Sequence, residues 1–323
     1  MELVRQKHSS ALFVLALSLS ACGGGGGIAA LPPAPQTPTP TPTPSVAPAN
    51  TFSWDYAAPV AGARLGLTIN LATGATTGVG LLEGATRDAF RVQENGNQYA
   101  IWAGHSKWDE DIPIFTHETL GAKPTSGDEA SNFDHYHFDW DGHSEDLQLL
   151  KKSATNSRIQ LSYLTYGLYS STFGAQDARQ SNIGVFVIGQ ETAAANVPRT
   201  GSGNYSGIVD GYASIGGTGY RLLGSTGTLS ASFASGTIAT TLSLRGNSDF
   251  LTGTLGSVQN FGTLNGTGTI AGGTSNYSGA LTGLGMNGQF AGGFFGPVAN
   301  ETGYSFSATG NVDTIAGVFV GKQ

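Results

Sequence analysis

The stretch "GGFFGPVANETGYSFSATG", residues 292–310, lies near the end of the printed sequence and decides how the C-terminal part folds. Small and apolar residues alternate on both sides of a Gly-Pro pair, which is the period-two pattern of β-strands. Gly296 and Pro297 predict a turn, because proline presets φ and cannot continue a ladder of backbone hydrogen bonds. We therefore expect a hairpin between late strands, with Glu301 accepting hydrogen bonds from the amides of the turn itself.

Two adjacent aromatic residues precede this turn. Phe294 and Phe295 are neighbours on a strand, so their side chains point to opposite faces. A phenylalanine left in water on a face of serine and threonine would be a liability. The sequence therefore predicts that both rings are buried, one inside a barrel and the other beneath residues 51–190.

The alternation extends through residues 198–323 and predicts a barrel. In "TGTLSASFAS", residues 226–235, apolar Leu229, Ala231 and Phe233 share one face and serines occupy the other. We expect strands to start near Tyr205, Tyr220, Thr237, Gly253, Leu264, Tyr277, Gly288, Tyr304 and Ile315. Short strands at this spacing favour a closed antiparallel barrel of eight strands, since closure leaves no free edge. The outward faces are rich in serine and threonine, so we expect a soluble barrel and not one that faces lipid.

Residues 51–197 form a second unit with a different composition. They are also β-rich, in runs such as "QYAIWAG" and "NIGVFVIGQE", but they carry 17 acidic residues against four in residues 199–323. The fold class predicted for the whole chain is all-β, with an N-terminal β-rich domain followed by the C-terminal barrel.

The first 50 residues predict export and anchoring. Residues 1–21 have basic residues and then an apolar run too short to span a bilayer, as in a secretory signal peptide. The following "LSAC", residues 19–22, resembles the lipobox of bacterial lipoproteins, which implies cleavage before Cys22 and lipid, including palmitate, on that residue. Gly23 stands where an aspartate would signal inner-membrane retention, so the resemblance implies the outer membrane of a Gram-negative bacterium. The rest of 22–50 alternates proline with threonine and predicts an extended tether.

Charge and cysteine content limit the function classes. Cys22 is the only cysteine, so the exported chain forms no internal disulfide. Without residues 1–21 the chain has 13 basic and 21 acidic residues, a formal net charge of −8. No basic patch or run occurs, which argues against nucleic acid as a partner. No sequence motif of an enzyme is present either, so we expect a protein that is not an enzyme.

The closing hairpin resembles the signature of the transferrin-binding protein B-like surface lipoproteins. The resemblance rests on Gly293, Phe294, Phe295, Gly296, Pro297, Ala299 and Glu301, followed by Gly317, Val318 and Phe319. It is close over the barrel and loose over residues 51–190. It implies a handle domain followed by an eight-stranded barrel, and the chain has room for one such lobe. It also implies capture of a host or environmental iron protein, haemoglobin, haem or another solute, which is passed to an outer-membrane transporter.

The strongest candidate for ligand chemistry is "DHYHFDWDGH", residues 134–143. In an extended strand, His135, His137 and Asp139 share one face, and the aromatic residues share the other. Two histidines at i and i+2 can share a metal, with His143, or His105 or His117 from the preceding loop, completing the set. One histidine is alternatively suited to ligate haem iron. The simpler alternative is an amphipathic strand whose His/Asp face lies in water.

Two further features have both a functional and a structural interpretation. Eleven acidic residues between Asp109 and Asp146 either steer a basic partner or keep a weakly charged protein in solution. Tyr163, Tyr166 and Tyr169 either form an exposed binding patch or fill a core, and core filling is the more common role.

These observations support three hypotheses. The first is a lipid-anchored protein that captures a ligand without catalysis, with haem or a metal ion as possible cofactors. The second is a structural or adhesive surface lipoprotein without a small ligand. The third is a metal-dependent hydrolase built on His135, His137 and Asp139, and it has the least support.

Overall fold

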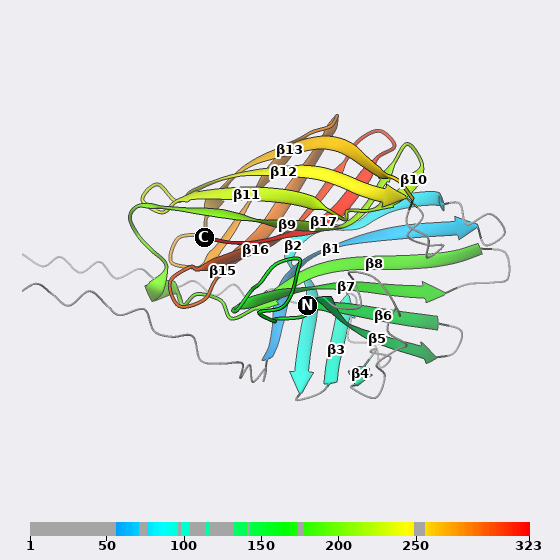
Figure 1. Ribbon diagram of the computed structural model, residues 1–323, viewed down its shortest axis with the longest axis horizontal. Coiled ribbons are helices and arrows are strands. Elements are labelled where there is room, and N and C mark those ends of the chain that lie inside the picture. Colours follow the sequence, from blue (N-terminus) through cyan, green and yellow to red (C-terminus); the bar gives the residue numbers. More distant parts are fainter. Residues whose placement is uncertain are drawn as a thin grey trace, which may run out of the picture. The chain divides into compact units, whose positions relative to one another are not determined.

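The computed structural model describes residues 56–70, 76–95, 98–103, 114–116, 132–140, 143–173, 178–248 and 256–323. The predicted signal peptide, Cys22 and the predicted tether lie outside these residues. Residues Pro48–Gln323 form one compact unit. Its described residues form two antiparallel sheets, which confirms the all-β prediction (Figure 1). No helix in this part of the chain is long and apolar enough to cross a membrane.

The N-terminal sheet, which we call the handle sheet, has the strand order β4-β3-β2-β1-β8-β7-β6-β5. Its strands are β1 (Tyr56–Asn70), β2 (Thr76–Asn95), β3 (Gln98–Ala103), β4 (Ile114–Thr116), β5 (Phe133–Trp140), β6 (His143–Leu150), β7 (Leu164–Phe173) and β8 (Ala178–Gly189). The sheet is curled, since its two edge strands, β4 and β5, contact each other. The curl encloses an apolar core around Phe90, Tyr136, Tyr169 and Phe186.

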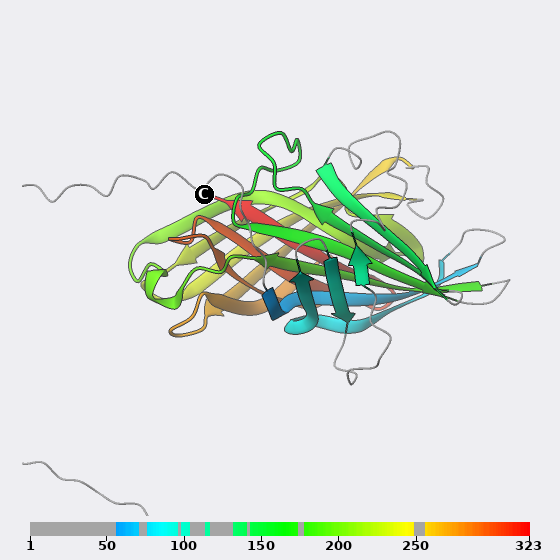
Figure 2. The ribbon, with the colours of Figure 1, turned by 90° about the horizontal axis from the view of Figure 1, so that it is seen from below.

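The C-terminal sheet closes on itself. It contains β9 (Ser202–Ile215), β10 (Thr218–Arg221), β11 (Ser225–Ser232), β12 (Thr237–Ser248), β13 (Val258–Ile270), β14 (Asn276–Gly283), β15 (Met286–Phe295), β16 (Glu301–Thr309) and β17 (Thr314–Lys322). Eight of these strands, all but β10, pair in a ring, because β12 pairs with β13 and β17 pairs with β9 (Figure 1, Figure 2). The short β10 pairs with β9 and β12. The predicted eight-stranded antiparallel barrel is therefore confirmed.

One expected strand start differs from the structure, since Leu264 lies in the middle of β13. The start expected near Gly253 lies outside the described residues. The structure has two strands in this region, β10 and β11, where the sequence predicts one start near Tyr220. Glycine-rich runs hide such boundaries, since glycine marks turns, bends and close approaches alike.

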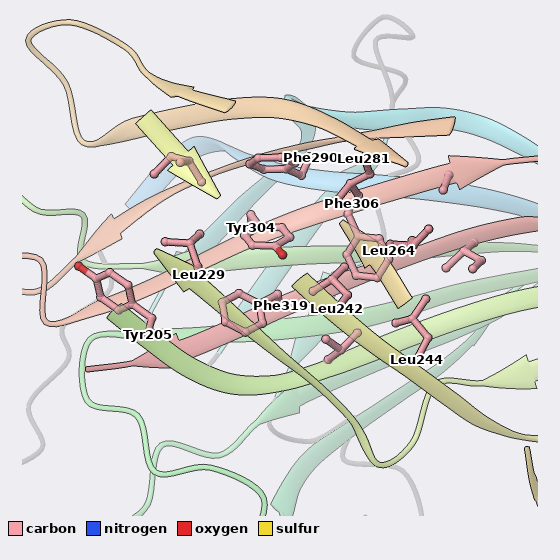
Figure 3. Packing of buried hydrophobic residues seen from close by; sticks show 14 of the residues in the cluster. Tyr205, Leu229, Leu242, Leu244, Leu264, Leu281, Phe290, Tyr304, Phe306 and Phe319 are labelled. Atoms are coloured by element: carbon pink, nitrogen blue, oxygen red, sulfur yellow. The ribbon is translucent and has the colours of Figure 1, made fainter. Parts of the chain in front are cut away.

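The barrel interior is solid. Alternate residues of every strand in the ring point inward, and Leu229, Ala231 and Phe233 are buried as the alternation predicted. Tyrosine, phenylalanine and leucine side chains from opposite walls meet along the axis (Figure 3). Tyr304, for example, lies 5.1 Å from both Phe290 and Phe319, ring centroid to ring centroid.

One outer face of the barrel is not the serine and threonine surface that the sequence predicted. On β17, the outward-facing Ala316, Val318 and Val320 are buried in a cluster shared with the handle sheet. Val185 and Val187 of β8 belong to the same cluster. The prediction was wrong for this face because the handle sheet covers it and excludes water from it.

Candidate functional site

Strand β5 carries His135 and His137 of the predicted ligand site and pairs with β6, which begins at His143, as a hairpin. His137 lies opposite Asp146 in this pairing. Tyr136 packs into the core of the curled handle sheet, and Asp139 is exposed. His135 is 9% exposed, and its ring lies 6.3 Å from that of Phe133, centroid to centroid. The strand is thus amphipathic, with one histidine drawn into the interior.

Both ring nitrogens of His137 contact carboxylates. Nδ1 lies 2.8 Å from Oδ1 of Asp146, and Nε2 lies 3.0 Å from Oδ2 of Asp139. The hydrogen bond with Asp146, aided by Asp139, raises the pKa of His137 above its usual value despite partial burial. This arrangement favours a protonated imidazolium, which cannot bind a metal.

Only some of the predicted metal ligands lie within the described residues. Within the described residues, no group of three or more His, Cys, Asp or Glu side chains is placed to hold a metal ion. The backbone of His143 pairs with Trp140 and Phe173, and its side chain lies outside the description. His105 and His117 lie outside the described residues altogether. The ligand role of His135, His137, Asp139 and His143 remains a prediction.

The three tyrosines and the acidic stretch belong in part to the interior. Tyr166 and Tyr169 are buried on opposite faces of β7, and Tyr163 is half-buried, so they form no common exposed patch. Glu145, one of the eleven acidic residues, is 3% exposed and accepts hydrogen bonds from the hydroxyls of Tyr169 and Ser171 at 2.6 and 2.7 Å. The core role of Tyr166 and Tyr169 is confirmed.

The closing hairpin fastens the barrel to the handle sheet. Phe294 is buried in the barrel core and Phe295 in the cluster between barrel and handle sheet, at 0% and 4% exposure, as predicted. Gly296, with φ of 87°, donates from its amide to the carbonyl of Gln190 at 2.9 Å, and Pro297 follows in the turn. The isolated bridge between Glu191 and Phe295 extends this contact.

The sequence predicts that Glu301 accepts hydrogen bonds from its own turn, but the structure shows different partners. Its carboxylate accepts hydrogen bonds from the backbone amides of Ser162, Tyr163 and Leu164 at 2.6, 2.8 and 3.1 Å. These amides lie just before and at the start of β7. Burial raises the pKa of Glu301, although the three amides and Lys322 oppose the shift. The prediction was wrong because the folded chain brings three amides that are distant in sequence within hydrogen-bond reach of the carboxylate.

A buried charge cluster makes the second polar connection. Asp210 of β9 is fully buried and accepts from Nε and Nη2 of Arg221 at 2.7 and 3.1 Å. From the handle side, Nη1 of Arg158 lies 3.0 Å from Oδ2 of Asp210, and the hydroxyl of Tyr166 donates to the same oxygen at 2.7 Å. Burial alone would raise the pKa of Asp210, but the two arginines and Tyr166 hold it at about 2.

Sequence reasoning missed this cluster, although one signal was present. Residues 199–323 contain only four acidic residues, Asp210, Asp249, Glu301 and Asp313. Asp210 interrupts an apolar run, "GIVDGYA", inside a strand. A charged residue in such a run needs a partner when it is buried, because an unpaired buried charge is costly.

No family model matches the chain, and no curated protein matches it. Among solved structures, it is similar to transferrin binding protein B of Haemophilus parasuis at 16% identity and a TM-score of 0.43, covering 81% of this chain and 45% of that one. It is similar to transferrin binding protein B of Neisseria meningitidis at 14% identity and a TM-score of 0.42, covering 80% and 43%.

A third solved structure is the N-lobe domain of lactoferrin binding protein B of Moraxella bovis, at 13% identity and a TM-score of 0.37, covering 82% of this chain and 100% of that one. The chain spans about half the length of the two transferrin binding proteins and all of the lactoferrin binding N-lobe. The ligands in those names belong to those proteins.

Proposed function

We propose that this protein is a lipid-anchored lipoprotein of the outer membrane that captures a ligand by non-catalytic binding and presents it to a transporter partner. The lipobox-like residues ending at Cys22 and the proline-rich tether support the anchor. The ligand class, an iron protein, haemoglobin, haem or another solute, follows from the sequence resemblance of the closing hairpin.

The observation that carries the proposal is the solid barrel. Large side chains from all eight strands fill its interior, including Tyr205, Tyr277, Phe290, Phe306 and Phe319. A barrel that encloses a solute keeps a cavity inside. This barrel instead acts as a scaffold, so its ligand binds on an outer surface, which favours a macromolecular ligand over a solute held within.

The rigid connection to the handle sheet supports the same function. Glu301 and Asp210 each join the two sheets through buried hydrogen bonds, and apolar side chains pack between them. A binding surface that is already ordered loses less entropy when a partner binds. The barrel thus holds the handle sheet ready for a partner.

A capture experiment tests the proposal. Residues 48–323, the compact unit, are passed over immobilised transferrin, lactoferrin and haemoglobin, and binding is followed by surface plasmon resonance. Saturable binding to an iron protein is the expected result. If no iron protein binds, and neither a haemin titration nor metal analysis detects a ligand, the capture function is wrong and the structural or adhesive alternative takes its place.

The haemin titration also tests strand β5. A shift of the Soret band that is lost in His135→Ala or His137→Ala, but kept in the control Ser144→Ala on the neighbouring strand, would assign the haem ligand to β5. A Soret shift that both histidine variants retain would exclude these histidines as ligands.

The anchor has its own test. Expression of the full chain in a Gram-negative host with radiolabelled palmitate should label the wild type and leave Cys22→Ala unlabelled. A wild-type chain that takes up no label, or a labelled Cys22→Ala chain, would contradict lipidation at this residue.

A further inference from the structure

A groove of about 280 Å³ lies at one end of the barrel. Three segments line it: residues 194–199, which follow the handle sheet, the turn between β11 and β12, and the turn between β13 and β14. Its lining includes Val197, Arg199, Phe233, Ile270, Gly272 and Gly273. The groove lies outside the β5 site and outside the contact between the two sheets.

The floor of the groove is apolar. Phe233 is 9% exposed and belongs to the barrel core, where its ring lies 5.3 Å from that of Phe294, centroid to centroid. Val197 and Ile270 pack against the same core and remain partly exposed. Water over such a surface is readily displaced by an apolar group.

Backbone hydrogen bonds fix the walls in place. The amide of Ile270 donates to the carbonyl of Gly236 at 2.8 Å and joins the two turns. The amide of Phe233 donates to the carbonyl of Gly201 at 3.0 Å and joins the β11 side to the segment that precedes β9. The groove is therefore formed before any ligand arrives, as small-molecule sites usually are.

One charged side chain lines this apolar groove. Arg199 is the only charged residue that lines it, and its side chain is exposed. Within the described residues, the Arg199 guanidinium forms no hydrogen bond or ion pair with a carboxylate. A guanidinium presents a planar fork of donors that matches a carboxylate. The guanidinium of Arg199 thus favours a ligand with an anionic group, and the apolar floor of the groove favours a ligand whose remainder is apolar.

We infer that this groove binds a small carboxylate with an apolar body, which lies on Phe233 and Ile270 while its carboxylate pairs with Arg199. The volume is near the lower end of that of small-molecule sites, about 300–1,000 Å³, and suits a ligand of about a dozen heavy atoms. This binding goes beyond the capture of an iron-related ligand and does not depend on it.

The test uses three probes with the same apolar body. Isotope-labelled residues 48–323 are titrated with 4-phenylbutyrate, 4-phenylbutanol and 4-phenylbutylamine, and amide shifts are followed by NMR. The carboxylate should shift the amides of Gly272 and Gly273 with a Kd of about 0.1–1 mM, and the amine should bind about tenfold more weakly or worse. Equal affinity for carboxylate and amine, or shifts confined to another part of the barrel, would overturn the inference.

Variants separate the charge from the apolar floor. Arg199→Ala should weaken the carboxylate about tenfold and leave the alcohol unchanged. Gly272→Phe should abolish binding of both by filling the groove, since a Cβ there meets nothing within 4 Å and the backbone does not need glycine. Arg245→Ala, at an exposed arginine on β12, is the matched control and should bind like the wild type. Unchanged carboxylate binding in Arg199→Ala would also refute the site.

Discussion

Replacing Asp210 by asparagine keeps the shape of the side chain and removes the negative charge that faces both arginines of the buried cluster between barrel and handle sheet. In the wild type, this carboxylate faces Arg221 and Arg158, whose side chains are 5% and 8% exposed. The hydroxyl of Tyr166 adds a third hydrogen-bond donor. Asparagine removes the carboxylate that both buried guanidinium groups face.

The expected decrease in the free energy of unfolding is large compared with the total stability of a domain. Removing one partner of a buried ion pair costs about 3–5 kcal/mol, because the remaining charge stays desolvated. A second estimate comes from the pKa of Asp210, which is lowered from 3.8 to about 2 and corresponds to about 2 kcal/mol of stability at neutral pH. We expect Asp210→Asn to lower the free energy of unfolding by about 2–5 kcal/mol at pH 7.

The assay is urea unfolding of residues 48–323, followed by two signals. All four tryptophans lie in residues 51–197, so tryptophan fluorescence reports the handle part, while far-UV circular dichroism reports both sheets. In the wild type the two transitions should coincide, since buried contacts couple the sheets. In Asp210→Asn the fluorescence transition should move to lower urea and separate from that of the barrel.

The pH dependence has a defined sign. The pKa of Asp210 is lower in the folded state, so its stabilisation is present above pH 3.8 and is lost as the pH falls toward about 2. The stability difference between the wild type and Asp210→Asn should therefore shrink between pH 4 and pH 2. Asp313→Asn, at a half-buried carboxylate that accepts an exposed hydrogen bond from the amide of Gly216, is the control and should cost about 1 kcal/mol or less. A loss below 1 kcal/mol in Asp210→Asn, or a difference that stays constant with pH, would refute this account of the cluster.

Glu301→Gln should lower the free energy of unfolding by about 2–3 kcal/mol, because glutamine offers one acceptor oxygen for three donors. It should also speed hydrogen exchange at the amides of residues 162–164, and unchanged exchange there would contradict the prediction. His137→Gln should lower the free energy of unfolding by less than about 1 kcal/mol at pH 6 and not at all at pH 9. The raised pKa of His137 stabilises the fold at low pH, and this stabilisation is lost as the pH rises through the folded-state pKa. A proton NMR titration checks that pKa. Gly207→Ala should lower stability by about 3 kcal/mol, since its Cβ would lie 1.9 Å from the carbonyl oxygen of the neighbouring strand β17, whereas Gly272→Ala, in open space, should be neutral in thermal unfolding.

The barrel was predictable from the sequence because its pattern is local. Each inward position alternates with an outward one along the strand, and a strand has no other way to bury one set of side chains. The same rule separated Phe294 from Phe295 and predicted that both are buried, which the structure confirms. Only the strand boundaries near Ser225 and Val258 escaped it, where glycine obscures the alternation.

The polar contacts were not predictable from the sequence, because their partners are far apart along it. Glu301 lies 137–139 residues from the amides that it accepts from, and Asp210 lies 44 residues from Tyr166. His137 shows the same limit at short range. The strand pattern placed it beside Asp139, but only the β5–β6 pairing brought Asp146 to its other ring nitrogen.

The all-β class, the closed barrel and the burial of the two phenylalanines follow from local sequence patterns, since period-two alternation and turn residues act over a few residues. Long-range packing places the handle sheet over β17, Glu301 and Asp210 against the handle, and Arg199 beside an apolar groove. These contacts depend on the packing of one sheet against another and on the meeting of distant turns. Side-chain chemistry makes them favourable, but only the folded chain brings the partners within reach.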